Sequence, residues 1–302
     1  MELYHAPRFR STRVIILYKE LLRAYSSEVD AIENEDSEPK SDSKVDVKTH
    51  LPVLRVHTFH DTDSFRSNKP EWYLKMNENG KVPYFRDFRC PKDGEEVGNI
   101  IFADLSVSTD PRAKQFQMVE IFESMAICTY LLNTYDIEHK LLFKHDPIYE
   151  AKYLQMSYFA SGTIDNLTAN SSPIQRVVTK YTGETTPGKS TDMMQLNEKA
   201  FIEVVGPILE KLLNSGPYLF GSKEFGAIDA ILAYNFVAVH KRKGWLGLFC
   251  SKKTSGEKES EEKIDNHKNT LLDYYKSNIA TRKSVQEAFD LTEEQLKEVI
   301  NY

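Results

Sequence analysis

The chain has 302 residues, of which 40% are hydrophobic and 28% are charged, and its formal net charge is −6. This composition is that of a soluble globular protein, and the acidic excess argues against a dedicated nucleic-acid-binding protein. Three cysteines are too few for a disulfide framework, and no apolar run approaches the roughly 18 residues of a membrane span. The first residues lack the pattern of a secretory signal, so we expect a cytoplasmic protein without membrane insertion.

The first half of the chain alternates between strand and helix patterns. A short strand at 3–5 ends near Pro7, and a helical repeat of apolar residues follows from Ser11, with Ser11 or Thr12 as its N-cap. Residues 51–59 alternate as a strand, and Asn79-Gly80 marks a turn before a strand that Pro83 opens. Further along, the pattern predicts a strand at 116–122 and a helix at 123–132.

The second half reads as helix throughout. The periodicity predicts helices at 148–162, 193–213, 227–243 and 271–289. Four polar segments interrupt the elements and are predicted to be loop insertions: 28–48, 89–115, 183–192 and 250–263. The first of them carries eight acidic residues and three lysines, so its net charge is −5, which is most of the net charge of the whole chain. A small α/β unit followed by an all-helical unit is therefore expected.

Two segments of the first half carry a plausible ligand site. A strand that begins at Pro83 can carry a cis peptide bond before it, and an extended peptide can then pair with the Val82 main chain. Glu123-Ser124 lies where a strand passes into a helix, whose free amides favour a carboxylate. Ser124 can add a hydrogen bond, and Glu123 can pair with an α-ammonium group. Each segment alone has a simpler interpretation: a turn before a strand in the first case, and a helix cap in the second.

Four ordered groups of residues resemble the cytosolic glutathione transferases of bacteria and fungi. They are Leu3-Tyr4-His5-Ala6-Pro7 with Ser11-Thr12-Arg13-Val14; Asn79-Gly80-Lys81-Val82-Pro83 with Glu123-Ser124-Met125-Ala126-Ile127; Tyr153-Leu154-Gln155 with Phe159-Ala160-Ser161-Gly162-Thr163; and Tyr218-Leu219-Phe220-Gly221 with Ala227-Ile228-Asp229-Ala230. No single group is specific, but the ordered set covers nearly the whole chain. In the last group Gly226 stands where the family usually has Ser or Thr, and Asp229 can still bond back to the Gly226 amide.

The resemblance implies a fold of class α/β plus all-α. A thioredoxin-like glutathione-binding domain would span 1–138, and an all-helical domain would span 146–302. It implies glutathione as co-substrate, no metal, and a homodimer that conjugates the glutathione thiol to small electrophiles in detoxification or reduces organic peroxides. The electrophile pocket would be lined from 148–170 and the last helix. Val82 would hold the cysteinyl backbone, Glu123 and Ser124 the γ-glutamyl end, and Lys81 the glycine carboxylate.

The thiol-activating group departs from the family pattern. The reaction needs a thiolate, and a thiol with a pKa near 8.5 is only slightly ionised at neutral pH. Arg8 and Phe9 occupy the positions where related classes carry a hydroxyl or thiol. Ser11 is the catalytic candidate, with a plain N-cap role as its alternative. Arg8 or Arg10 could instead stabilise a thiolate by charge, and Tyr4 lies early in the strand, where we expect it to be packed.

This departure leaves a second function open. The alternative is a binding or regulatory protein that keeps the fold and glutathione affinity but has lost the chemistry. A third interpretation, a chloride-channel-like relative that inserts into membranes, lacks any apolar segment to insert. The three cysteines do not follow the first strand, so a catalytic cysteine is not expected.

Overall fold

The computed structural model describes residues 1–30, 51–89, 117–142, 147–168, 195–213, 216–241, 244–256 and 270–290. Its contacts divide the chain into two compact units, Met1–Ile137 (unit 1) and Glu138–Tyr302 (unit 2). The predicted insertion at 183–192 and most of those at 28–48 and 89–115 lie outside the described residues. Within the described part of the chain, no helix is long and apolar enough to cross a membrane.

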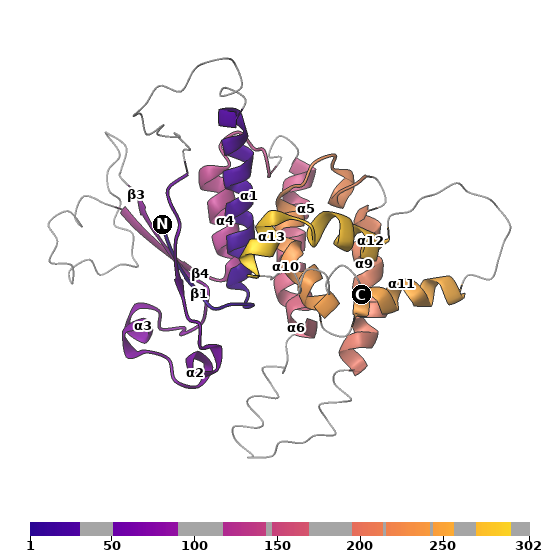
Figure 1. Ribbon diagram of the computed structural model, residues 1–302, viewed down its shortest axis with the longest axis horizontal. Helices are drawn as coiled ribbons and strands as arrows, with labels where there is room; N and C mark the ends of the chain where they lie inside the picture. Colours follow the sequence, from indigo (N-terminus) through magenta and orange to yellow (C-terminus); the bar gives the residue numbers. More distant parts are fainter. Residues whose placement is uncertain are drawn as a thin grey trace, which may run out of the picture. The chain divides into compact units, whose positions relative to one another are not determined.

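Unit 1 is built on a four-stranded mixed sheet (Figure 1). The strands are β1 (Glu2–His5), β2 (Arg55–Thr58), β3 (Tyr84–Arg89) and β4 (Gln117–Phe122). Their order across the sheet is β2-β1-β3-β4. β1 runs parallel to β2 and antiparallel to β3, and β3 runs antiparallel to β4.

Two helices, α1 (Ser11–Asp30) and α4 (Ser124–Tyr135), lie side by side on one face of this sheet (Figure 1). Leu3 and Phe85 are fully buried, as are Leu17 and Leu21, which recur at helical spacing in α1. α1 continues to Asp30, so the predicted loop at 28–48 was wrong for its first three residues. The helix keeps its apolar repeat beyond the point where acidic residues begin.

The short helices α2 (Thr62–Ser67) and α3 (Glu71–Met76) follow β2, in a stretch where no element was predicted. Their apolar residues Phe65 and Tyr73 join Tyr4 and Tyr84 in a buried aromatic cluster. The expected packing of Tyr4 is confirmed, because its side chain is only 7% exposed. This cluster fixes the segment that leads from α3 into β3.

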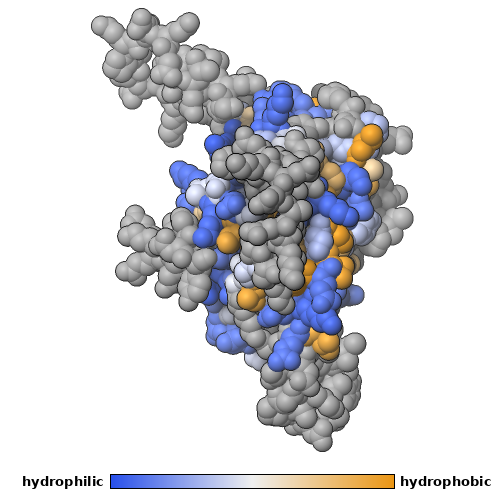
Figure 2. Space-filling view, turned by 90° about the vertical axis from the view of Figure 1, so that its right-hand side faces the viewer, coloured by the Kyte–Doolittle hydropathy of each residue, from blue (hydrophilic) through white to orange (hydrophobic). Residues whose placement is uncertain are grey.

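Unit 2 is helical and is organised around the almost wholly buried helix α10 (Ala227–Lys241). Its other elements are α5 (Pro147–Phe159), the π-helical η3 (Ala160–Ile164), α6 (Asp165–Thr168), helical residues 195–200, the π-helical η4 (Phe201–Val205), α9 (Gly206–Leu213), the 3₁₀ turn η5 (Leu219–Gly221), α11 (Trp245–Gly256), α12 (Leu271–Tyr274), the π-helical η6 (Tyr275–Ile279) and α13 (Lys283–Ala288). α10 contacts α5, α6, η3, α11 and η6. On the face shown in Figure 2, hydrophilic residues surround separate groups of hydrophobic ones.

Two predictions in this unit were wrong. Residues 250–256 were expected in a loop but belong to α11, a helix whose first turns are anchored by the buried side chains of Trp245, Leu246 and Phe249. The single helix expected at 271–289 is interrupted before α13. Arg282 adopts an extended conformation there, and its guanidinium lies 3.6 Å from the centre of the Phe225 ring.

The predicted bond of Asp229 to the Gly226 amide is confirmed, with a nitrogen-to-oxygen distance of 2.9 Å. The same carboxylate accepts from the Leu219 amide at 3.0 Å and from the Tyr274 hydroxyl. The Asp229 side chain is fully buried, and burial raises its pKa to about 6 against the opposing effect of these donors. This carboxylate ties the start of α10 to η5 and α12.

Candidate functional site

Three turns of unit 1 meet at one end of the sheet. The register pairs Tyr4 of β1 with Tyr84 of β3, and Tyr84 with Phe122 of β4. Because both pairings are antiparallel, the residues after Tyr4, before Tyr84 and after Phe122 all lie at the same end. The sheet therefore brings the predicted residues Val82 and Glu123 together with the turn that leads into α1.

Glu123 and Ser124 occupy the passage from β4 into α4. Glu123 is the N-cap residue of α4, and its backbone φ is 73°, a value that residues other than glycine rarely adopt. Its carboxylate is exposed and makes no capping bond within the described structure. Ser124 is buried, and its hydroxyl accepts a 3.0 Å hydrogen bond from Arg13 Nη1. The strained backbone thus presents a carboxylate to solvent beside a helix N-terminus.

Lys81 and Val82 lie on the segment that enters β3. The Lys81 carbonyl accepts hydrogen bonds from the Tyr73 hydroxyl at 2.7 Å and from Asn77 Nδ2 at 2.8 Å. The Val82–Pro83 peptide bond is cis, as the sequence allowed, and the Val82 side chain packs against the aromatic cluster. The Lys81 side chain is exposed. Two buried side chains therefore fix the main chain of this segment while its lysine remains in solvent.

Ser11 is the first residue of α1 and is fully buried. The expected N-cap role of its hydroxyl was wrong. The hydroxyl oxygen lies 2.8 Å from Nδ1 of His5 and 3.4 Å from the amide nitrogen and the carbonyl oxygen of Ala6. Burial, with a further contribution from His60, lowers the pKa of His5 to about 4, so this imidazole is neutral at physiological pH.

The turn between β1 and α1 carries the residues that replace the usual hydroxyl. Arg8 is exposed and has a φ of 65°, in the left-handed region. The guanidinium of Arg66, on α2, lies 4.8 Å from the centre of the Phe9 ring. An aromatic ring with a cation over it therefore lies in the turn between β1 and α1.

Two residues of this site were not among the predicted ones. Arg13 is fully buried and contacts Ser124. Its place on the apolar face of α1, four residues before Leu17, could have marked it as a buried charged residue from the sequence alone. His5 gave no such signal, because a histidine at the end of a short strand is compatible with many roles. Cys128 is buried in α4, and burial raises the pKa of its thiol to about 12, which makes it a poor nucleophile. Cys90 lies outside the described residues.

The chemistry of the α4 terminus suits a zwitterion. The positive end of the helix dipole and the buried Arg13 favour an anionic group near Ser124. The exposed carboxylate of Glu123 favours a cationic group of the ligand beside that anionic group. An α-amino acid group carries both charges on neighbouring atoms, so it matches this arrangement better than a simple anion does.

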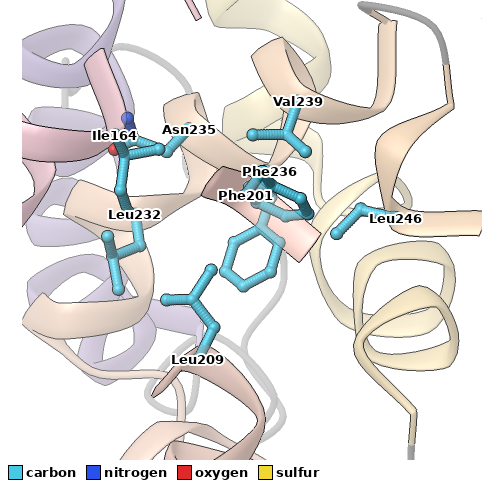
Figure 3. A pocket seen from close by; sticks show the side chains of 8 residues that line it. All are labelled: Ile164, Phe201, Leu209, Leu232, Asn235, Phe236, Val239 and Leu246. Atoms are coloured by element: carbon cyan, nitrogen blue, oxygen red, sulfur yellow. The ribbon is translucent and has the colours of Figure 1, made fainter. Parts of the chain in front are cut away.

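A gap in the interior of unit 2 differs from this site in every respect. It lies between Ile164, Leu232, Phe236 and the other side chains of Figure 3, all of them buried, and these side chains leave no room for a water molecule. Seven of the eight lining residues are apolar, and the eighth, Asn235, donates a 2.7 Å hydrogen bond to Asp165. It is a seam in the packed core between helices, without polar groups directed at a ligand.

The comparisons with solved structures identify the fold. A glutathione transferase homologue from Sulfitobacter, solved with bound glutathione, is 15% identical over 96% of each chain, with a TM-score of 0.55. A glutathione transferase from Burkholderia graminis, with two glutathione molecules bound per subunit, is 15% identical over 97% of this chain and 88% of its own, with a TM-score of 0.56. Glutathione transferase F7 from Populus trichocarpa is 14% identical over 100% of this chain and 99% of its own, with a TM-score of 0.53.

No family model matches the sequence, and no curated protein matches it. The likeness to solved structures nevertheless extends over nearly the whole chain. The chain has the glutathione transferase fold, with a thioredoxin-like unit followed by a helical unit, as the sequence predicted.

Proposed function

We propose that unit 1 binds glutathione at the end of the sheet where Val82, Glu123 and Ser124 meet. The observation that carries the proposal is the exposed Glu123 carboxylate, held on a left-handed backbone beside the start of α4 and not used as a cap in the described structure. Such backbone strain costs of order 1–3 kcal/mol and persists where surrounding structure enforces it, commonly at ligand sites. The proteins of this fold solved with bound glutathione support the same ligand.

The ligand fits the site group by group. Glu123 would pair with the α-ammonium of the γ-glutamyl residue, and Ser124 with the free amides of α4 would hold its carboxylate. The cysteinyl main chain would pair with Val82 as an added strand. Lys81, whose side chain is exposed, would contact the glycine carboxylate. Glutathione is extended and carries these charged groups at its two ends.

The chemistry that follows binding is attack of the glutathione thiolate on a small electrophile or an organic peroxide. Ser11 remains the catalytic candidate from the sequence. Its burial and its bond to His5 mean that a thiol would need this turn to open before touching the hydroxyl. Backbone amides and the charges of Arg8 and Arg10 are the other sources of thiolate stabilisation at the turn.

A second candidate function, glutathione binding without turnover, is favoured by Phe9. Phe9 stands at the sequence position where the family resemblance places a hydroxyl donor, and the Arg66 guanidinium lies 4.8 Å from the centre of its ring. A chlorodinitrobenzene-type substrate and cumene hydroperoxide separate the two candidates. Turnover of either supports an enzyme, whereas glutathione affinity with no turnover supports the binding protein.

We also propose a cytoplasmic homodimer. The helix α5 carries exposed apolar side chains at Ile148, Leu154 and Tyr158, with Tyr158 76% exposed. Such side chains favour burial against another surface, and a second copy would provide one. Light scattering on a sizing column measures the mass: a single 34.8 kDa species at micromolar concentration would contradict the dimer.

Isothermal titration with glutathione tests the binding proposal. We expect Glu123→Gln to weaken binding at least tenfold, because a neutral amide cannot pair with the ammonium group. Glu203→Gln is the matched control, since Glu203 is an exposed glutamate of unit 2 that lies 3.9 Å from Lys199. Equal affinities for Glu123→Gln and the wild type would remove Glu123 from the site.

A further inference from the structure

The last residue of β1 and the first residue of α1 are joined by a buried side-chain bond. His5 Nδ1 and Ser11 Oγ lie 2.8 Å apart, and the two residues are 5% and 0% exposed. The bond is available in either neutral tautomer: Ser11 donates to Nδ1 when the ring proton is on Nε2, and Nδ1 donates to Ser11 otherwise. It therefore closes the chain between residues 5 and 11 into a ring.

Both ends of this ring are anchored. The His5 carbonyl accepts a 2.8 Å hydrogen bond from the Phe59 amide, beyond the end of β2, so the histidine is fixed to the sheet. Ser11 begins a 20-residue helix that packs against α4. The chain between them, Ala6–Arg10, must reverse direction within five residues. Arg8 is left-handed at the centre of this turn, and the Phe9 amide donates to the Ala6 carbonyl at 3.2 Å.

We propose that His5 is a positioning residue, which holds the Ala6–Arg10 turn through Ser11 so that the turn faces the glutathione sulfur. This inference rests on the proposed function, because the sulfur reaches the turn only if glutathione binds along Val82 and Glu123. Ionisation of the bound thiol breaks its S–H bond, leaves the electron pair on sulfur and releases the proton to solvent. The turn stabilises the thiolate by its amides and arginines, and His5 sets their place without touching the sulfur.

The neutral state of His5 agrees with this role. Its ring lies in a buried position with His60 nearby, and both disfavour a charge on the imidazole. A neutral ring keeps one nitrogen as donor and one as acceptor, so in either tautomer Nδ1 can bond to the Ser11 hydroxyl. Replacing His5 with a neutral amide therefore changes only the position of the atom that bonds to Ser11, and leaves the charge near neutral pH the same.

Two amide variants separate this role from general packing. The side-chain amide of His5→Asn reaches the place of Nδ1 and can keep the bond to Ser11, whereas the longer side chain of His5→Gln places its amide near Nε2 and cannot. The thiol pKa of bound glutathione, followed by the ultraviolet absorbance of the thiolate, is the readout, and it needs no turnover. The affinity for S-methylglutathione, which has no ionisable thiol, reports whether the rest of the site is intact.

We expect the wild type to bind glutathione with a thiol pKa below that of the free tripeptide. His5→Gln and Ser11→Ala should each raise this pKa by up to about one unit, a tenfold change in ionisation that corresponds to the loss of one hydrogen bond. His5→Asn should restore the wild-type value, and the double variant His5→Gln/Ser11→Ala should be no worse than either single one, since both break the same bond. The two His5 variants should bind S-methylglutathione within about twofold of the wild type.

Equal thiol pKa values in His5→Asn and His5→Gln, or additive effects in the double variant, would overturn the role of His5 while glutathione binding stands. A wild-type thiol pKa equal to that of free glutathione would show that the turn does not act on the sulfur, and would overturn it too. If the wild type binds neither glutathione nor S-methylglutathione, the proposed function itself is wrong and the inference falls with it.

Discussion

Two carboxylates at helix starts are used in different ways: Glu123 lies before α4 in unit 1, and Asp229 lies in the first turn of α10 in unit 2. Asp229 is fully buried and accepts from two amides and a tyrosine hydroxyl. Glu123 is exposed, lies on left-handed backbone and caps nothing in the described structure. A carboxylate whose oxygens accept hydrogen bonds from its own chain stabilises the fold. A carboxylate that is exposed on a strained backbone is available to a ligand.

The largest expected effect is the loss of Asp229. Asp229→Ala leaves the Leu219 and Gly226 amides and the Tyr274 hydroxyl without this acceptor, and we expect a cost of about 3–5 kcal/mol in the free energy of unfolding. The control is Asp273→Ala, which removes an aspartate that bonds back to the Thr270 amide and hydroxyl at the exposed start of α12 and should cost about 1 kcal/mol. Urea titration measures both, and equal costs would contradict the contrast between closed and open carboxylates.

The pH dependence of stability should have opposite signs in the two units. The pKa of His5 is lowered to about 4 from 6.5, so the unfolded chain binds more protons between these values and unit 1 loses stability as pH falls. The pKa of Asp229 is raised to about 6 from 3.8, so the folded chain binds more protons there and unit 2 gains stability as pH falls. Each contribution amounts to about 3 kcal/mol over its range.

The two tryptophans allow each unit to be followed alone, since Trp72 lies in unit 1 and Trp245 in unit 2. Urea unfolding of the Trp245→Phe protein, monitored by Trp72 fluorescence, should show a falling midpoint from pH 6.5 to 4. The Trp72→Phe protein should show the Asp229 contribution, which Asp229→Asn removes. The same slope in both proteins would contradict the assignment.

A smaller effect tests how closely the helices of unit 2 are packed. A Cβ at Gly206 would lie 2.6 Å from the Phe249 ring, so Gly206→Ala should cost about 1–3 kcal/mol. Gly162 is the matched control, because nothing lies within 4 Å of its Cβ position and Gly162→Ala should stabilise the helix by about 0.5–1 kcal/mol. Thermal unfolding separates the two, and a neutral Gly206→Ala would show that α11 can move away from α9.

A small gain in stability is expected from a change at Glu123. Glycine adopts a φ of 73° without strain, so Glu123→Gly should raise the free energy of unfolding by about 1 kcal/mol. The same variant should lose glutathione affinity with the carboxylate. A loss of stability in Glu123→Gly would mean that the side chain supports the fold, which would place Glu123 in the same class as Asp229.

Much of the fold was predictable because the patterns that specify it are local. Short stretches of sequence contain the strand alternation, the helical repeat of α1, and the glycine and proline that precede β3. The bond of Asp229 to the Gly226 amide, three residues away, was expected for the same reason. The extent of α11 was not predictable, because the polar residues after Cys250 show no apolar repeat, although they continue a helix that begins with the buried Trp245, Leu246 and Phe249. The break before α13 was not predicted either: Arg282 is extended there and its guanidinium contacts the Phe225 ring, which lies 57 residues earlier in the chain.

The site was predictable in part for the same reason. Val82, Glu123 and Ser124 were identified from the turns that carry them, and the antiparallel register brings those turns to one end of the sheet. Two other residues of this region, Arg13 and His5, were missed. Arg13 meets Ser124 across 111 residues of sequence, and His5 is significant only through a bond to Ser11 that depends on the exact turn between β1 and α1.

The central claim is that Glu123 serves a ligand and Asp229 serves the fold, and titration calorimetry with glutathione tests it most directly. We predict that wild-type protein binds glutathione and that Glu123→Gln binds at least tenfold more weakly with an unchanged unfolding midpoint. Undiminished binding by Glu123→Gln, or no binding by a folded wild-type protein, would contradict the claim.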